Sequence, residues 1–167
     1  MCIASPHTSN WDGVLLVVLA QSVGLSLSFL AKESLLRGPQ RSLLLRFGAI
    51  PIERSRTHNV VTQLIEEFRR REELHLIIAP EGTRASTDYW RSGFYHIARG
   101  ADVPLVPGYM DYARKRAGFG SPLRLSGDVR ADMDRVRAFY ADLRCHARFP
   151  RQVGPIRLRE EEVGPRG

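Results

Sequence analysis

The sequence predicts an α/β fold: one layered domain with a mostly parallel central sheet flanked by helices. Short apolar runs of strand length alternate with segments of helical periodicity through most of the chain, a pattern typical of parallel sheets. No repeat and no linker divides the 167 residues, and 43% of them are hydrophobic, which suffices for a packed core. We therefore expect a single domain over residues 1–149, followed by a flexible, charged tail over residues 150–167 that is rich in proline and glycine.

In the first third of the chain, strands and helices are expected in turn. Residues 2–4 form the end of a short buried strand, and residues 11–23 form a helix with a broad apolar face that a glycine ends. Residues 27–31 are a second strand, and residues 40–47 are a short helix after a Gly-Pro break. The next strand, at residues 49–54, contains a proline, which favours an edge or irregular position in the sheet.

The middle of the chain carries the clearest patterns. Residues 59–71 place apolar side chains on one helical face and charged ones on the other, and residues 74–79 form an apolar, buried strand. A helix is expected at residues 92–99, ended by a glycine, and a proline-containing strand is expected at residues 103–110. The last elements are expected to be strands at residues 115–119 and 123–125 and a closing helix at residues 132–146.

The charge of the chain favours anionic partners. The formal net charge is +7, and 23 arginines stand against two lysines. Phosphate esters, anionic lipid surfaces and nucleic acids all suit such a balance, although a genome that prefers arginine codons explains it equally well. Nucleic acid is the poorest fit, because the basic residues are dispersed and are not clustered with aromatic ones.

Several classes of protein and of site are excluded. Cys2 and Cys145 are too few for a disulfide framework or a zinc site, and a reduced, intracellular setting is expected. The longest apolar run, at residues 14–20, is far shorter than the roughly 20 residues of a membrane span, so we expect a protein that sits on a bilayer without crossing it. No serine elbow, phosphate loop or dinucleotide fingerprint occurs. A covalent acyl-enzyme is therefore not expected, and a histidine that activates a bound hydroxyl fits better.

A histidine and a carboxylate, His7 and Asp12, follow the first predicted strand. On an ideal helix, their side chains would point about 140° apart and could not meet. They can meet if His7 lies in the loop before the helix and Asp12 lies in its first turn, capped by Ser9 or Asn10. The carboxylate would then fix the tautomer of the imidazole and leave the other ring nitrogen free to accept a proton. This spacing alone is weak evidence for a catalytic dyad.

Three further polar clusters follow other predicted strands, and the carboxyl ends of parallel strands meet at one edge of the sheet, where ligands bind. They are Lys32, Arg54 and the turn that contains Glu81, Gly82, Thr83 and Arg84. The cations could bind a phosphate, and the glycine would let backbone amides approach it. Taken singly, each cluster also has an ordinary interpretation: a helix-flanking lysine, a surface arginine and a strand-to-loop turn. The other histidines lack the spacing of metal ligands, and no metal is expected.

In order along the chain, these clusters match four sequence blocks of one family. The chain resembles the glycerolipid acyltransferases typified by 1-acylglycerol-3-phosphate O-acyltransferase. Residues 7–12 match the His-x4-Asp block, residues 48–54 a block with a glycine, an isoleucine and an arginine, and residues 80–84 the Pro-Glu-Gly-Thr-Arg block. Residues 103–107 resemble the fourth block, a hydrophobic strand with prolines. The chain departs from the family at Pro6, where asparagine is frequent, and at Ala79, where phenylalanine is common.

The resemblance implies a function and a set of site residues. His7 would be the general base and Asp12 its orienting partner. The base would deprotonate the hydroxyl of 1-acylglycerol-3-phosphate, which would attack the thioester of acyl-CoA or acyl-carrier protein to give phosphatidic acid. Arg54 and Arg84, with Lys32 as a weaker candidate, would bind the acceptor phosphate. The residues that would shape the site are Glu81, Gly82 and Thr83.

The same resemblance leaves two alternatives open. One keeps the chemistry and changes the acceptor to another lysophospholipid, an amino-acid lipid or a glycolipid. The other is a non-catalytic lipid-binding domain, which the intact His7 and Asp12 argue against. No cofactor is implied beyond the thioester donor. The implied fold is that of glycerol-3-phosphate acyltransferases, and the implied location is cytoplasmic, with peripheral contact to the inner face of the membrane.

Overall fold

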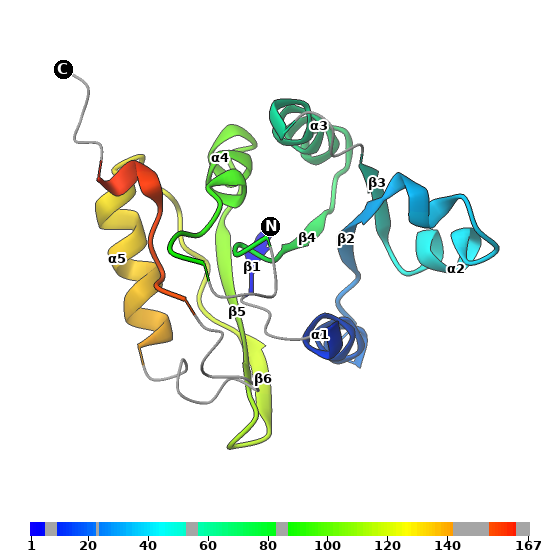
Figure 1. The fold of residues 1–167 in the computed structure, drawn as a ribbon, viewed down its shortest axis with the longest axis horizontal. Helices are drawn as coiled ribbons and strands as arrows, with labels where there is room; N and C mark the ends of the chain where they lie inside the picture. Colours follow the sequence, from blue (N-terminus) through cyan, green and yellow to red (C-terminus); the bar gives the residue numbers. More distant parts are fainter. Residues whose placement is uncertain (6–9, 23, 53–56, 83–86, 142–153, 163–167) are drawn as a thin grey trace.

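Strands β3-β2-β4-β1-β5-β6, in that order, form one mixed sheet in a computed structural model that describes residues 1–5, 10–22, 24–52, 57–82, 87–141 and 154–162 (Figure 1). All neighbouring strands are parallel except β5 and β6, which are antiparallel. The predicted α/β fold with a mostly parallel sheet is thus confirmed. The strands are β1 (Cys2–Ala4), β2 (Leu27–Lys32), β3 (Ala49–Ile52), β4 (His75–Ile78), β5 (Leu105–Asp111) and β6 (Arg116–Phe119).

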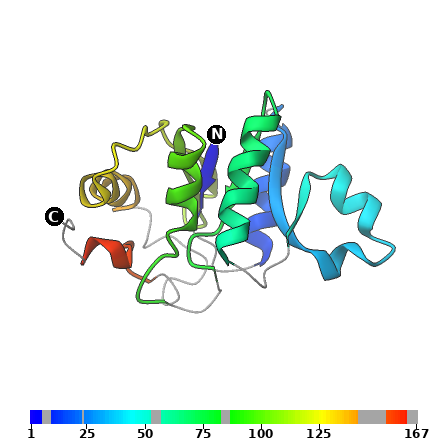
Figure 2. The same ribbon diagram turned by 90° about the horizontal axis from the view of Figure 1, so that it is seen from above.

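Helices cover both faces of the sheet. Figures 1 and 2 show α3 and α4 side by side over one face and α1 over the other. This division is the one that right-handed crossovers produce, because the chain moves in one direction across the sheet through α1 and in the opposite direction through α3 and α4. The helices are α1 (Asn10–Ser22), α2 (Arg41–Arg46), α3 (Thr57–Arg70), α4 (Gly93–Gly100) and α5 (Val129–Tyr140), with two 3-10 turns, η1 (Glu33–Leu36) and η4 (Arg159–Glu161).

The short strand β1 lies at the centre of the core. Its side chains alternate between two apolar clusters, as the two-residue period of a strand requires. Cys2 and Ala4 pack against residues of α4 and α5, whereas Ile3 packs against residues of α1, β2 and β4 on the other face. All three are buried almost completely, at 0%, 0% and 1% exposed. A strand buried on both faces can be entirely apolar, and this explains the unbroken apolar run in the sequence.

Two predicted elements that follow β6 in the chain differ from the structure. Residues 123–125 do not form a strand, since Leu123 makes only an isolated antiparallel bridge to Leu105. The closing helix α5 begins at Val129 and not at Asp132, because Asp128 caps it by accepting a hydrogen bond from the amide of Ala131 at 3.1 Å. The predicted end of this helix, at residue 146, lies outside the described residues.

Residues 154–162 do not behave as the free tail that the sequence predicts from residue 150. Ile156 and Leu158 are only 5% and 1% exposed and belong to the main apolar cluster. Leu158 bridges to Trp90, whose amide donates to the carbonyl of Arg157 at 2.8 Å. The segment folds back because its apolar residues alternate with charged ones and fill one face of the domain. The domain boundary predicted at residue 149 lies outside the described residues.

Candidate functional site

The carboxyl ends of four adjacent parallel strands, β3, β2, β4 and β1, lie along one edge of the sheet. The register aligns Lys32 with Ile52 and Ala4 with Ile78, so neighbouring strands end at nearly the same level. The segments that follow these strands contain the four predicted polar clusters. The topology therefore places all four clusters at the same edge, where open α/β sheets bind their ligands.

The predicted dyad is described only in part. The backbone of Asp12 lies in the first turn of α1, as the dyad requires, but its side chain lies outside the described residues, as does all of His7. The chain leaves β1 through Ser5, which is 1% exposed and whose amide donates to the carbonyl of Ile78 at 3.2 Å. The segment that leads to His7 thus starts directly beside the end of β4. The contact between His7 and Asp12 stays a prediction.

The predicted phosphate-binding cations are also described only in part. Lys32 is the last residue of β2, next to β3 and β4, but its side chain is not described. Arg54, Thr83 and Arg84 fall in residues 53–56 and 83–86, outside the described chain. The structure therefore brings the backbones before and after these positions to one edge. That the side chains of Lys32, Arg54 and Arg84 meet at this edge remains a prediction.

The turn after β4 is built around Gly82. The amide of Gly82 donates to the carbonyl of Ala79 at 3.1 Å, and the amide of Arg91 donates to the carbonyl of Pro80 at 2.7 Å. Gly82 has a φ of +65°, and a Cβ on it would lie 2.4 Å from Nε of Arg91. Glycine is favoured here because its φ would strain any other side chain, and a Cβ would also make the flexible Arg91 side chain move away.

Glu81 and Tyr140 are buried polar residues near this edge of the sheet. Glu81 is 4% exposed, so it is not a residue of an ordinary exposed turn. The hydroxyl of Tyr140, from α5, lies 2.8 Å from the carbonyl oxygens of both Ala4 and Gly108 and shares its one proton between them. Burial raises the pKa of Tyr140 well above its usual value, and the negative charge of Glu81 raises it further. The hydroxyl therefore remains protonated and ties α5 to the end of β1.

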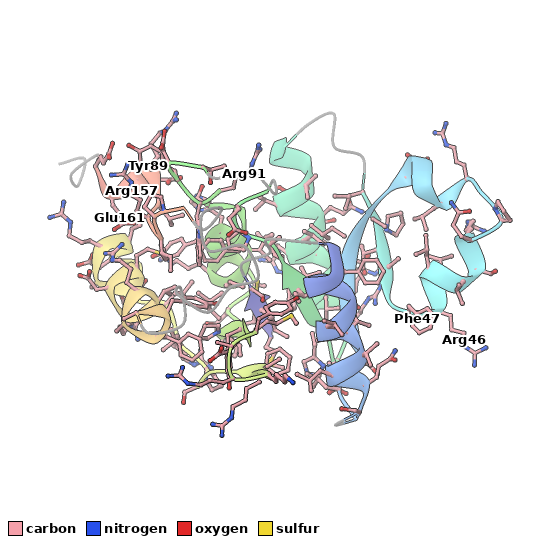
Figure 3. The ribbon with its side chains drawn as sticks, turned by 60° about the horizontal axis from the view of Figure 1, so that its bottom comes forward. Arg46, Phe47, Tyr89, Arg91, Arg157 and Glu161 are labelled. Atoms are coloured by element: carbon pink, nitrogen blue, oxygen red, sulfur yellow. The ribbon has the colours of Figure 1, made fainter. Side chains whose placement is uncertain are left out.

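Arg91 is a cation at this edge that the sequence analysis missed. Its side chain crosses Gly82 and is exposed, and it makes no ion pair with any residue that the structure describes. Figure 3 shows it extending from the body on the side where α3 begins, which is the side of the carboxyl ends. Its neighbour Trp90 is 3% exposed and anchors this loop in the core. In the sequence, this position is marked only by an arginine that follows a tryptophan, which is a weak signal.

Cys2 and the described histidines are poor candidates for the chemistry. Burial raises the pKa of the Cys2 thiol to about 12, so the thiolate that a covalent mechanism needs does not form at neutral pH. Nε2 of His75 lies 3.5 Å from Glu73, and Nε2 of His96 lies 3.8 Å from Glu160. Neither histidine follows the carboxyl end of a strand.

Other kinds of site are weakly represented in the described part of the chain. No group of three His, Cys, Asp or Glu side chains there is arranged to hold a metal ion. None of the described helices combines the length and the apolar character needed to span a bilayer. A hollow of about 160 Å³ lies between the end of α4 and the start of β5, at the opposite edge of the sheet from the four clusters.

Comparison with known protein families gives a match over most of the chain. The model of the acyltransferase family matches residues 1–111, which run from β1 to the end of β5 and include all four polar clusters. No curated protein and no solved structure matches the chain significantly. Since the matched region spans well over half of the chain and its general chemistry is acyl transfer, the chain belongs to the acyltransferase family.

Proposed function

We propose that this protein is an O-acyltransferase that moves a fatty acyl group from acyl-CoA or acyl-carrier protein to 1-acylglycerol-3-phosphate, giving phosphatidic acid. The observation that carries the proposal is the direct pairing of β1 and β4, with Ala4 opposite Ile78. The His-x4-Asp segment follows the first of these strands, and the Pro-Glu-Gly-Thr-Arg segment follows the second. A base and a phosphate-binding turn would therefore begin side by side.

In the proposed reaction, His7 accepts the proton of the acceptor hydroxyl as its oxygen attacks the thioester carbonyl carbon. The new C–O bond forms, the C–S bond of the tetrahedral intermediate breaks, and the thiolate that leaves takes the proton from His7. Asp12 holds the imidazole in the required tautomer and stabilises its charged form. The burial of Cys2 supports this direct transfer, because the only thiol in the described residues is not a thiolate at neutral pH.

The acceptor phosphate would be bound by Arg54 and Arg84, with Lys32 beside them. We add Arg91 to this set, since its side chain already lies against Gly82 and no described residue neutralises it. Arginine suits the role because its planar guanidinium can donate two hydrogen bonds to one phosphate. Glu81, Gly82 and Thr83 would shape the turn that carries the second arginine. The substrates place the enzyme at the inner face of the cytoplasmic membrane as a peripheral protein.

The proposal is tested by mixing the purified protein with acyl-CoA and lysophosphatidate. We expect release of free thiol and formation of phosphatidic acid, detected by mass spectrometry, and we expect both to fall to background in His7→Ala. Acyl-carrier protein is tested as the second donor. Lack of product with either donor and with several lysolipid acceptors would contradict the proposal, and so would normal turnover by His7→Ala.

A further inference from the structure

The largest concentration of exposed apolar side chains in the described chain lies on α2 and the residue that ends it. Leu43, Leu45 and Phe47 are 56%, 40% and 41% exposed. The other large apolar side chains that are similarly exposed, Leu15 and Val18, lie on α1. Leu43 and Phe47 are four positions apart and share one side of the helix, and Leu45 lies on the other side of the inward-facing Leu44. Single exposed apolar residues are ordinary, but three within five positions, called the patch below, call for a partner.

The patch is exposed because α2 is attached to the domain by only one of its leucines. Leu44 packs against Ala31, Leu36 and Ala49, while no residue of α2 is fully buried. Figure 2 shows η1 and α2 projecting beyond β3 at the edge of the sheet, and Figure 3 shows Phe47 and Arg46 pointing away from the body.

The position of Phe47 is fixed by the glycine that follows it. Gly48 has a φ of +88°, and a Cβ on it would lie only 2.2 Å from the carbonyl oxygen of Leu27. The amide of Phe29 also donates to the carbonyl of Gly48 at 3.1 Å. The end of α2 is therefore held firmly against β2, and the aromatic ring before this glycine is presented outward by a rigid part of the fold.

The charges around the patch indicate what covers it. Arg41 and Arg46 are the first and last residues of α2, both are exposed, and neither forms an ion pair with a described residue. The helix has no acidic residue of its own. A second copy of this surface would bring arginines against arginines, and a neutral apolar partner would strip them of water without a counter-charge. A surface of lipid phosphates above acyl chains satisfies both the apolar and the cationic groups.

We propose that α2 and Phe47 form the membrane-docking surface of this protein, with the apolar side chains in the interface of an anionic phospholipid bilayer and Arg41 and Arg46 on lipid phosphates. This deepens the proposed function, whose acceptor is itself a membrane lipid. The docking segment follows β2 after the turn η1 and runs back to the amino end of β3, where Gly48 meets Leu27, so it would lay the side of the sheet at β3 against the lipid.

The first test measures binding to vesicles of phosphatidylglycerol and phosphatidylcholine by co-sedimentation. We expect the triple variant Leu43→Ser, Leu45→Ser and Phe47→Ser to bind roughly tenfold more weakly or worse, because it removes most of the apolar patch. The matched control is Leu15→Ser with Val18→Ser, which removes similarly exposed apolar side chains from α1. Equal loss of binding in the two variants, or no loss in the triple variant, would overturn the proposal. All replaced side chains are exposed, and circular dichroism checks that both variants fold.

The second test places a reporter in the patch. In Phe47→Trp, the fluorescence above that of the wild-type protein should shift to shorter wavelength with phosphatidylglycerol vesicles and be quenched by lipids with brominated chains. Arg41→Ser with Arg46→Ser should weaken this response, and salt of about 1 M, where the Debye length is about 3 Å, should weaken it in the parent protein. A tryptophan that stays exposed to water, or a shift that follows protein concentration without lipid, contradicts membrane docking.

Both tests are run without acyl donor, so they do not depend on catalysis. If the vesicle results are as expected and no acyl transfer occurs, the proposed reaction fails and the docking surface stands. If lysophosphatidate is acylated but the triple variant binds vesicles and turns over like the wild type, the docking surface fails alone.

Discussion

Gly82 and Arg91 together decide what the turn after β4 offers to a ligand. The glycine lets the arginine side chain cross the backbone closely, and the hydrogen bond from the Arg91 amide to Pro80 ties the two segments together. The guanidinium is thereby delivered to the edge of the sheet by a loop that Trp90 anchors. An exposed cation that pairs with no described residue, held by an ordered loop, is well suited to bind an anionic group.

If Arg91 binds the acceptor phosphate, Arg91→Ala should lower kcat/KM roughly 10- to 150-fold, the value of a hydrogen bond to a charged group. The loss should lie mainly in KM for a phosphate acceptor, and Arg91→Lys should restore part of it. Steady-state kinetics with lysophosphatidate measures both effects. The control is Arg70→Ala, which removes an exposed arginine at the end of α3, at the opposite edge of the sheet. Equal kinetics of Arg91→Ala and the wild type would remove Arg91 from the site.

Tyr140 stabilises the same edge of the sheet from within the core. Tyr140→Phe keeps the ring but removes the hydroxyl that donates to Ala4 and Gly108, so we expect the free energy of unfolding to fall by about 1–2 kcal/mol. Urea denaturation measures the change. The control is Tyr109→Phe, because the hydroxyl of Tyr109 has no hydrogen bond to a described residue, and its loss should cost less than about 0.5 kcal/mol. Equal costs for the two variants would show that the bonds of Tyr140 add nothing.

At the scale of the elements, α5 is held by the buried carboxylate of Asp132. Burial alone would raise the pKa of Asp132, but hydrogen bonds from the amides of Ser126 and Gly127, from the Tyr95 hydroxyl and from Arg135 lower it to about 2. The Tyr95 hydroxyl lies 2.8 Å from Oδ2, and the two amides lie 3.0 and 3.1 Å from the carboxylate oxygens. One ionised side chain thus joins α4, the turn before α5 and α5 itself.

The pKa of Asp132 gives a pH dependence of stability. The unfolded chain takes up a proton near the ordinary value of 3.8, whereas the folded protein resists it down to about 2, so stability is present above pH 4 and is lost as the pH falls through this range. Asp132→Asn should therefore lower the free energy of unfolding by at least about 2 kcal/mol at pH 7. The difference from the wild type should shrink between pH 4 and pH 2, and urea denaturation across these pH values measures it.

Asp134→Asn is the matched control for this prediction, since Asp134 lies on the same helix but is 66% exposed and forms a surface pair with Arg137. Its cost should stay below about 1 kcal/mol and change little with pH. A pH-independent cost of Asp132→Asn would mean that its carboxylate is not the group that loses stability in acid.

At the scale of the whole molecule, the segment at residues 154–162 links α5 to the loop that contains Trp90. It covers Trp90 with Leu158, and Arg137 of α5 donates to the carbonyl of Ile156 at 3.1 Å and to the carboxylate of Glu161 at 2.7 Å. Figure 3 shows Arg157 and Glu161 of this segment near Tyr89, whose ring lies 4.5 Å from the guanidinium carbon of Arg157. The segment thus holds the loop of Tyr89, Trp90 and Arg91 against α5.

Leu158→Ala should lower the free energy of unfolding by about 2–5 kcal/mol, because it leaves a cavity beside Trp90. The control Leu43→Ala, at a position 56% exposed, should cost less than about 0.5 kcal/mol. Thermal unfolding of the two variants makes the comparison. A small effect of Leu158→Ala would mean that this segment only rests on the domain.

The parallel centre of the fold was predictable from the sequence because its signal is local. A buried strand such as β4 needs only its own apolar residues and the turn after it, and the edge position of β3 follows from Pro51. Contacts between distant residues left no such signal. The contacts of Arg91 with Gly82 and of Tyr140 with Ala4 join residues far apart in the sequence and exist only in the folded chain. Ile156 and Leu158 lie among charged residues, so the sequence did not indicate that they belong to the core. The sequence predicted which loops carry the candidate site residues, but it did not predict the contacts that hold these loops in place.

The antiparallel pairing of β5 with β6 has a consequence for anyone who shortens this protein. The family match ends at Asp111, the last residue of β5, so a fragment chosen by its motifs would omit β6. The amide and carbonyl groups of β5 that now pair with residues 116–119 would then face water. An exposed apolar strand of this kind is a template for pairing with other chains, and such a fragment should accumulate as aggregates. The strand that keeps β5 paired therefore lies after the part of the chain that carries the family's motifs.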